Sequence, residues 1–239
     1  MRKIVVVLGG FLLFFSCEEE LNLNFTEINA IYKESAIIEI NIPKAEGKSA
    51  LSKAINSTLE NHIASVLNFS EEDSETIQLD EAIKHFEAEF KAFKSDYEES
   101  AMVWEAVFDG EVIYQSPEVI CIAINGYTNT GGAHGNMNIT LYNFDIKDGA
   151  VLKHDDIILK MEEFMEIAKQ YFTKEIEAQG EDMAEDYFFE EGFHLPANIG
   201  FNDEGILLLY NVYEIASYAQ GLTEFTIPFE EVNSFLKVH

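Results

Sequence analysis

The hydrophobic period of this chain changes along its length, and that pattern restricts the folds that the chain can adopt. Apolar residues recur every three or four positions over residues 49–68 and 79–97, which predicts two amphipathic helices. From about residue 102 the period becomes two, which is typical of β-strands. A third helical segment follows at 161–176, and strands then return. Because helices and strands come in blocks, the sequence predicts an α+β fold with mainly antiparallel sheets and packed helices.

The expected strands of the first half are bounded by turn residues. A strand over residues 28–42 is expected to end at Pro43. Residues 102–116 are expected to form a hairpin about Asp109-Gly110, because this dipeptide suits a tight turn. Further strands are predicted over residues 118–128, 136–146 and 150–154.

The second half returns to β structure after its helix. Residues 198–216 predict a hairpin that turns at residues 203–205, and residues 224–228 predict one more strand. Pro228 is expected to begin a short final helix. We expect two small, closely associated subdomains, over residues 28–140 and 141–239.

Residues 1–16 have the layout of a secretory signal peptide. Arg2 and Lys3 precede an apolar run that is too short to span a membrane as a mature helix. Cys17 follows a small residue directly after this run, which resembles the lipobox of bacterial lipoproteins. The resemblance implies cleavage before Cys17, acylation of that cysteine by chains such as palmitate, and attachment to a membrane. An ordinary signal peptide with an incidental cysteine is the alternative.

Residues 17–27 are expected to form an acidic tether between the lipid and the folded part. The run Glu18–Glu20 after the cysteine resembles the surface-export signal of Bacteroidetes lipoproteins. It implies an outer-membrane lipoprotein of the cell envelope that faces outward, and attachment facing the periplasm stays open.

The charge of the chain excludes one class of partner. The sequence holds 15 basic and 44 acidic residues, a net charge of −29. Cleavage after residue 16 would remove two basic residues and leave 13 against 44, a charge of −31. Such a field repels phosphate backbones, so we expect no nucleic-acid partner, and it attracts cationic proteins or ions.

The two cysteines predict no disulfide framework if Cys17 is acylated. Cys121 lies in the apolar run VICIAI and is expected to be a small buried hydrophobe. The chain has neither a CxxC motif nor a Cys/His spacing typical of zinc sites, so we expect no metal and no cofactor.

The stretch NGYTNTGGAHGNMNITLYNF places Gly131 and Gly132 beside a single histidine, His134. It matches neither a phosphate-binding loop nor a hydrolase nucleophile motif. We expect the glycines to shape a turn between two strands, and His134 to brace that turn by a hydrogen bond to the main chain. The alternative is a catalytic or metal-binding His134 that acts with Asp155 or Asp156, which requires the fold to bring these side chains together.

Three ordered motifs resemble a known extracytoplasmic module. They are GGAH at Gly131–His134, D-x-x-x-G at Asp145–Gly149, and YEIAxYAxG at Tyr213–Gly221. The early strand before Pro43 and the helix with Ile55-Asn56 extend the match over nearly all of the chain after residue 28. The module is found in the anti-sigma-V factor, which senses lysozyme, and before the catalytic domain of PdaC-type peptidoglycan deacetylases. This chain has Ser217 where the family usually has proline.

The resemblance implies an α+β fold of two associated halves and no activity of its own. We therefore expect a non-enzymatic, lipid-anchored binding module that recognises a cationic lysozyme-like protein or a cell-wall glycan. Tyr213 and Tyr218 are candidates for the binding surface, although alternation along a strand would place some of these tyrosines in the core. An envelope hydrolase or deacetylase that uses His134, and a structural lipoprotein, are the alternatives.

Overall fold

A computed structural model describes residues 23–68, 77–132, 134–180, 187–188 and 192–238. The predicted signal peptide, Cys17 and most of the expected tether lie outside these residues. The described part contains two sheets and confirms the α+β fold with mainly antiparallel pairing.

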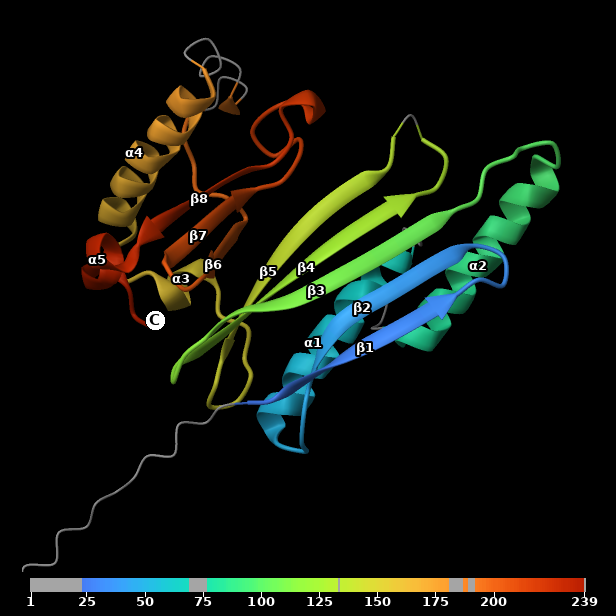
Figure 1. Ribbon diagram of the computed structural model, residues 1–239, viewed down its shortest axis with the longest axis horizontal. Helices are drawn as coiled ribbons and strands as arrows, with labels where there is room; N and C mark the ends of the chain where they lie inside the picture. The colour runs from blue at the N-terminus through green and yellow to red at the C-terminus, as the bar shows by residue number, and fades with distance from the viewer. Residues whose placement is uncertain (1–22, 69–76, 133, 181–186, 189–191, 239) are drawn as a thin grey trace, which may run out of the picture.

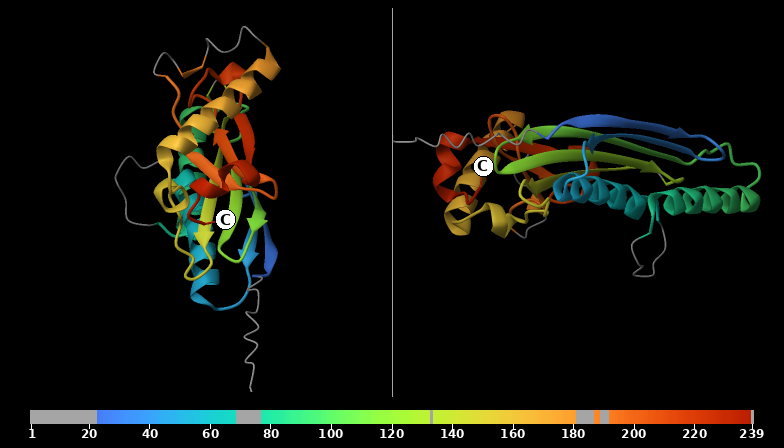
Figure 2. Two further views of the ribbon diagram at one scale, coloured as in Figure 1. Left: turned by 90° about the vertical axis from the view of Figure 1, so that its left-hand side faces the viewer. Right: turned by 90° about the horizontal axis from the view of Figure 1, so that it is seen from below.

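The first sheet has five strands in the order β1-β2-β3-β4-β5. The strands are β1 (Phe25–Tyr32), β2 (Ile37–Ala45), β3 (Glu105–Gln115), β4 (Val119–Asn129) and β5 (Asn136–Asp145). All neighbours are antiparallel except β2 and β3, which are parallel. Parallel strands need a long crossover, and here it consists of α1 (Ala50–Leu67) and α2 (Leu79–Asp96). Both helices lie on one face of the sheet (Figures 1 and 2).

The two helices form where the sequence predicts them. Ser49 caps α1, because the main-chain N–H of Ser52 donates to its hydroxyl over 3.1 Å. The apolar stripe of α1 is fully buried against the sheet and comprises Leu51, Ile55, Leu59, Ile63 and Leu67. Asn56 fastens the helix to β2, since its side-chain amide accepts from the N–H of Ala45 and donates to its carbonyl.

The second sheet has three antiparallel strands in the order β6-β7-β8. They are β6 (Asn198–Phe201), β7 (Gly205–Tyr210) and β8 (Thr223–Pro228), accompanied by α3 (His154–Ile157), α4 (Met161–Gln179) and α5 (Phe229–Val232). Two short 3₁₀ turns, η3 (Tyr218–Gln220) and η4 (Asn233–Phe235), complete this half. The predicted helix, the β6–β7 hairpin and the strand before Pro228 are confirmed.

Strand β4 contributes to both cores of the molecule. Ile120, Ile122 and Ile124 pack in the cluster under α1 and α2. Val119 and Cys121 point to the other side and pack in the cluster of the second sheet. This two-sided burial explains why the run VICIAI is continuously apolar rather than alternating. Burial raises the pKa of the Cys121 thiol to about 12, and the residue is a core side chain as predicted.

Three asparagine side chains join the two sheets along β5. Asn198 accepts from the N–H of Leu141, and Asn143 donates to the carbonyl of Ile199 over 2.7 Å. Asn211 accepts from the N–H of Ile139 and donates to its carbonyl, both over 2.8 Å. Because strand β5 has no strand partner on this side, the amides of Asn198 and Asn211 satisfy its main-chain groups, whereas Asn143 on β5 binds the main chain of β6.

Several expected boundaries are wrong in the first half. The segment expected as one strand over 28–42 is a hairpin of β1 and β2, and Pro43 lies within β2 rather than after it. Strand β1 begins at Phe25, so the end of the expected tether belongs to the sheet. Asp109-Gly110 is no turn, because β3 runs straight through it. A side chain at Gly110 would lie 2.8 Å from the ring of Pro43, so this glycine permits a close approach of β2.

Further along the chain, the boundary expected between residues 140 and 141 cuts strand β5, which pairs with β4 along its whole length. Residues 154–157 form a short helix, and Val151 makes only an isolated bridge to Phe144. The expected hairpin extends to residue 216, but β7 ends at Tyr210 and the segment after it leaves the sheet.

Candidate functional site

The glycine-rich stretch forms the turn between β4 and β5. Gly131 has φ +108°, a conformation that favours glycine, and a side chain there would lie 2.6 Å from the sulfur of Met102. A side chain at Gly135 would lie 2.2 Å from the ring of Tyr127. The glycines therefore let neighbouring side chains close over the turn.

His134 lies at this turn with both ring nitrogens engaged. Its Nδ1 lies 2.9 Å from the carbonyl of Gly135, which can only accept, so Nδ1 carries the proton and donates. Nε2 lies 3.2 Å from the hydroxyl of Tyr213, which donates to it in the tautomer that carries its proton on Nδ1. His134 thus braces the turn and also connects it to a loop that follows β7.

The rings of His134, Tyr213 and Tyr218 form a cluster, which we call the aromatic cluster. His134 and Tyr218 stack with centroids 4.0 Å apart and planes inclined by 20°. Tyr213 lies with its ring centroid 5.6 Å from that of Tyr218. Tyr213 is 56% exposed and Tyr218 is 37% exposed, so both rings face solvent and neither lies in the core. In Figure 1 the loop with η3 and the β4–β5 turn lie at the same end of the molecule.

The loop that carries the two tyrosines is held in an uncommon conformation. Tyr213 has φ +66°, which is rare for an aromatic residue and marks local strain. Glu214 fixes the loop, since its carboxylate accepts from the N–H groups of Asn211 and Ala197 over 2.8 and 2.7 Å. Ser217 adopts φ −67°, the angle that proline would impose, so the expected family proline and this serine give the same backbone geometry.

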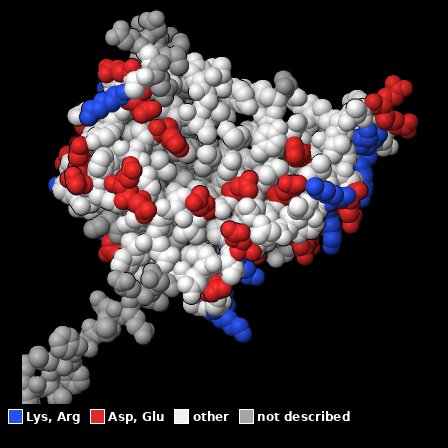
Figure 3. Space-filling view, viewed as in Figure 1, with Lys and Arg blue, Asp and Glu red and all other residues white. Residues whose placement is uncertain are grey.

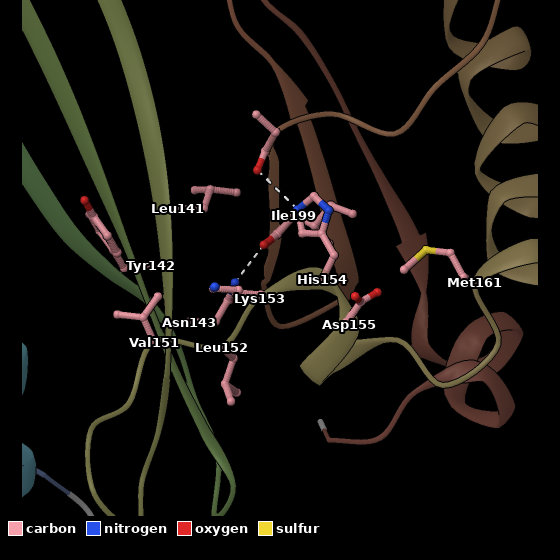
Figure 4. Close-up of a pocket in the computed structure, with 11 residues that line it drawn as sticks. Leu141, Tyr142, Asn143, Val151, Leu152, Lys153, His154, Asp155, Met161 and Ile199 are labelled. Carbon is pink, nitrogen blue, oxygen red and sulfur yellow. Dashed lines mark hydrogen bonds between the residues drawn. The ribbon is translucent and has the colours of Figure 1, made fainter.

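A cavity of about 540 Å³ lies where the two sheets meet (Figure 4). Its lining includes Leu141, Asn143, His154, Asp155 and Ile199. Nε2 of His154 donates to the carbonyl of Ala197 over 3.2 Å, so the ring is held against β6.

The polar groups at this cavity serve the junction between the sheets. Asn143 is 2% exposed, and its Oδ1 has no hydrogen-bond partner. Burial raises the pKa of Tyr142, which lines the same cavity and contacts Nδ1 of His62 over 3.0 Å. The carboxylate of Asp156 caps α3, because it accepts from the N–H of Lys153 over 2.9 Å.

The structure does not bring His134 together with Asp155 and Asp156. His134 precedes the first residue of β5, whereas Asp155 lines the cavity beside Leu141. At about 3.3 Å per residue, the strand between these levels separates them by roughly 20 Å. A reaction that needs His134 and these carboxylates at one centre has no support in this geometry.

The described residues offer no other grouping for metal chemistry. Within the ranges that the structure covers, no three His, Cys, Asp or Glu side chains are arranged to hold a metal ion. Among the helices of that same part, none is long and apolar enough to cross a membrane. Acidic side chains are spread over both halves on the face shown in Figure 3.

The sequence motifs predict the members of the aromatic cluster but not the asparagine junction. A usable signal exists, since Asn143 interrupts the apolar pattern of TLYNF and Asn211 directly follows the apolar run ILLLY. Buried asparagine needs partners for its amide, so such positions indicate contact with another main chain.

Two family models match this chain. Residues 30–137 match the model described as Deacetylase PdaC, and residues 155–230 match a protein of unknown function, DUF3298. Peptidoglycan-N-acetylmuramic acid deacetylase PdaC of Bacillus subtilis (strain 168) is 24% identical over 171 residues, which are 67% of this chain. The match covers 36% of that relative, so this chain spans about a third of its length.

Two solved structures share the fold. A DUF3298 family member from Bacteroides fragilis NCTC 9343 has a TM-score of 0.68 at 21% identity, covering 90% of this chain and 94% of its own. A DUF3298 family protein from Pseudomonas aeruginosa PAO1 has a TM-score of 0.63 at 18% identity, with the same coverage of both chains. This chain therefore carries the module in which a PdaC-type N-terminal domain is followed by a DUF3298 domain.

Proposed function

We propose that this chain is a non-enzymatic binding module of the bacterial cell envelope, anchored by a lipid on Cys17, that recognises a protein or a cell-wall glycan. The observation that carries the proposal is the aromatic cluster. His134 and Tyr213 are 79 residues apart in the sequence, yet their segments meet and hold the rings of the cluster in solvent. The main chain at Tyr213 is strained, with φ +66°. Exposed rings held on a rigid scaffold are typical of protein-binding surfaces, where tyrosine is enriched.

The charge of the chain supports a cationic partner within this class. A net charge of −29 before processing would steer a basic protein, such as a lysozyme-like hydrolase, toward the module. The relation to a peptidoglycan deacetylase supports an envelope setting, in which wall glycan is the other candidate ligand.

Binding is tested by titrating the mature protein with a cationic lysozyme and with soluble peptidoglycan fragments, at low and at high salt. We expect one of these probes to bind at low salt. Tyr218→Ala should weaken that binding about tenfold or more, as for a central interface residue. Tyr213→Asn removes the second ring and keeps a residue type that tolerates positive φ, so it should have a similar effect.

The matched control is Tyr97→Ala, because Tyr97 is an exposed tyrosine at the end of α2, away from the cluster. Equal affinities for the Tyr218 and Tyr97 variants would remove the aromatic cluster as the binding surface. No binding of either probe by the wild-type protein would remove both proposed ligand classes.

The lipid anchor has its own test, since it depends on Cys17 alone. Mass spectrometry of the protein from intact cells should show a chain that begins with an acylated Cys17. Cys17→Ala should release the protein from the membrane fraction, and protease treatment of intact cells reports whether the module faces outward. An unacylated mature chain would overturn the anchor and leave the binding proposal standing.

A further inference from the structure

One carboxylate lies on the buried face of α2 with no partner. Glu87 is 6% exposed, and its Oε1 makes no hydrogen bond. Among the described residues, no basic nitrogen lies within 4.0 Å of its carboxylate. The position belongs to the apolar stripe of the helix, one turn after Ile83 and one turn before Phe90, where both neighbours are buried.

An unpaired buried carboxylate needs an explanation. Removal of an ionised group from water is costly unless a counter-charge and hydrogen bonds replace the lost hydration. A leucine at this position would continue the stripe, so packing alone does not account for an acidic side chain. Only Oε1 of the carboxylate is both buried and unpaired, so the side of Oε2 is open to an opposite charge that arrives from outside the fold.

Space for such a charge exists directly beside Glu87. A pocket of about 380 Å³ lies between α2 and the end of β1, and it is lined by Tyr32, Glu34, Asp80, Ile83, Lys84 and Glu87. Glu87 and Ile83 are its buried residues, Tyr32 is half-buried, and the other three are exposed. The lining therefore has acidic groups at its base and at its rim, with an apolar wall between them.

The lining specifies the chemistry of an occupant. Three carboxylates against one lysine favour a cation, and the ring of Tyr32 adds a face that attracts cationic groups. Ile83 and Tyr32 suit an apolar stem, which a bare metal ion does not have. An extended side chain or small molecule that ends in an ammonium or guanidinium group meets both requirements.

Within the chain, Lys84 is the basic residue that could itself neutralise Glu87. It lines the pocket but forms no ion pair with Glu87, although residues three apart lie on the same face of a helix. Lys33, on the neighbouring turn, pairs with Glu39 over 3.2 Å and is directed elsewhere. The cations nearest to the pocket thus leave Glu87 unpaired.

From this arrangement we infer that the pocket between β1 and α2 binds an organic cation, with Glu87 as the buried counter-charge. The cation comes either from a basic side chain of a partner protein or from a free amine, and both share this chemistry. The site lies apart from the aromatic cluster and does not depend on the function proposed for it.

The test titrates the mature protein with agmatine and cadaverine as small probes and with an arginine-rich peptide as the protein-like probe. Wild-type protein should bind at least one of them. Glu87→Gln should weaken that binding about 30-fold or more, the range for removal of one partner of a buried charge pair. Glu81→Gln is the control, because it removes the same charge from an exposed position of the same helix. Binding of the peptide alone would identify a protein partner, and binding of the small amines alone would identify a free amine.

Stability without ligand separates this inference from a purely structural role. Because Glu87 is unpaired, Glu87→Gln should raise the melting temperature of the free protein and abolish the further rise that a cationic probe gives to the wild type. Lys84→Met should leave the fold stable and strengthen probe binding by removing a like charge. A large loss of stability in Lys84→Met, or equal probe binding by the Glu87 and Glu81 variants, would overturn the inference. So would a stabilisation by calcium chloride that exceeds the effect of sodium chloride at the same ionic strength and is lost in Glu87→Gln.

Discussion

At the scale of single residues, the junction of the two sheets depends on amides that imitate main chain. Asn211 presents one acceptor and one donor to Ile139, as a neighbouring strand would. This arrangement ends the strand pairing at β5 and still satisfies its outer edge. The same device recurs in Asn56, which pairs with both main-chain groups of Ala45.

Replacement of Asn211 should therefore reduce the free energy of unfolding by more than the small size of its side chain indicates. Asn211→Ala leaves the N–H and the carbonyl of Ile139 without partners, and we expect the free energy of unfolding to fall by about 1–3 kcal/mol. Asn138→Ala, at an exposed position of β5 next to Ile139, should change the free energy of unfolding by less than about 0.5 kcal/mol. Urea unfolding of both variants measures the difference, and equal losses would contradict the role given to Asn211.

The thiol of Cys121 should be inert in the folded protein. Burial holds its pKa at about 12, and no described residue lies in a disulfide with it. In a Cys17→Ser background, where Cys121 is the one remaining cysteine, a thiol reagent should react only after unfolding in urea. Rapid labelling in native buffer would show that the core about β4 opens.

At the scale of elements, the contact between α1 and β5 should respond to acid. His62 on α1 lies 3.0 Å from the hydroxyl of Tyr142, and burial lowers the pKa of His62 below its ordinary value of 6.5. The unfolded chain therefore binds this proton more tightly than the folded one. Its contribution to stability is present above about pH 6.5 and is lost as the pH falls toward the folded pKa.

His62→Gln should flatten this dependence, because glutamine does not titrate and can still accept from Tyr142. We expect urea unfolding to show a smaller loss of stability between about pH 7.5 and pH 5 in the variant than in the wild type. Parallel curves for the two proteins would mean that His62 does not contribute to the acid response.

The elements differ in how well the sequence predicts them. Helices α1, α2 and α4 follow from apolar spacing, because each buries one stripe against a sheet. The Asp109-Gly110 prediction is wrong because local turn chemistry cannot reveal that β2 packs against Gly110. Residues 211–216 are rich in apolar and aromatic side chains, which favours a continued strand, yet Glu214 binds the main chain of this segment and turns it out of the sheet.

The candidate site also has features that the sequence predicts and features that it does not. The sequence predicts the residues of the aromatic cluster from the glycine and tyrosine motifs. It does not predict that they meet, since His134 lies in the turn before β5 and Tyr213 lies in a loop after β7. Glu87 was also visible in the sequence as an acidic residue on an apolar stripe. The sequence does not show that Oε1 of Glu87 lacks a hydrogen-bond partner, because this depends on the residues that surround α2.

At the scale of the whole molecule, acidic charges far outnumber basic ones, 44 against 15. Among the described residues, Lys33 pairs with Glu39 and Lys147 with Asp145, and both pairs are exposed to solvent to some degree. Mutual repulsion of the remaining carboxylates should destabilise the compact state, and salt screens it. The melting temperature should therefore rise with added sodium chloride, and potassium chloride at the same ionic strength should give the same rise. A decrease with salt would contradict this account.

Because β4 packs in both hydrophobic cores, the two halves of such proteins should not be separable by truncation or by domain fusion. The two family matches meet between residues 137 and 155, yet a cut there strips Val119 and Cys121 of their covering. Neither half should fold stably by itself, and fusion proteins in which only one half is replaced should precipitate. In evolution, too, the two domains are expected to be inherited together, whichever catalytic or signalling segment they are joined to.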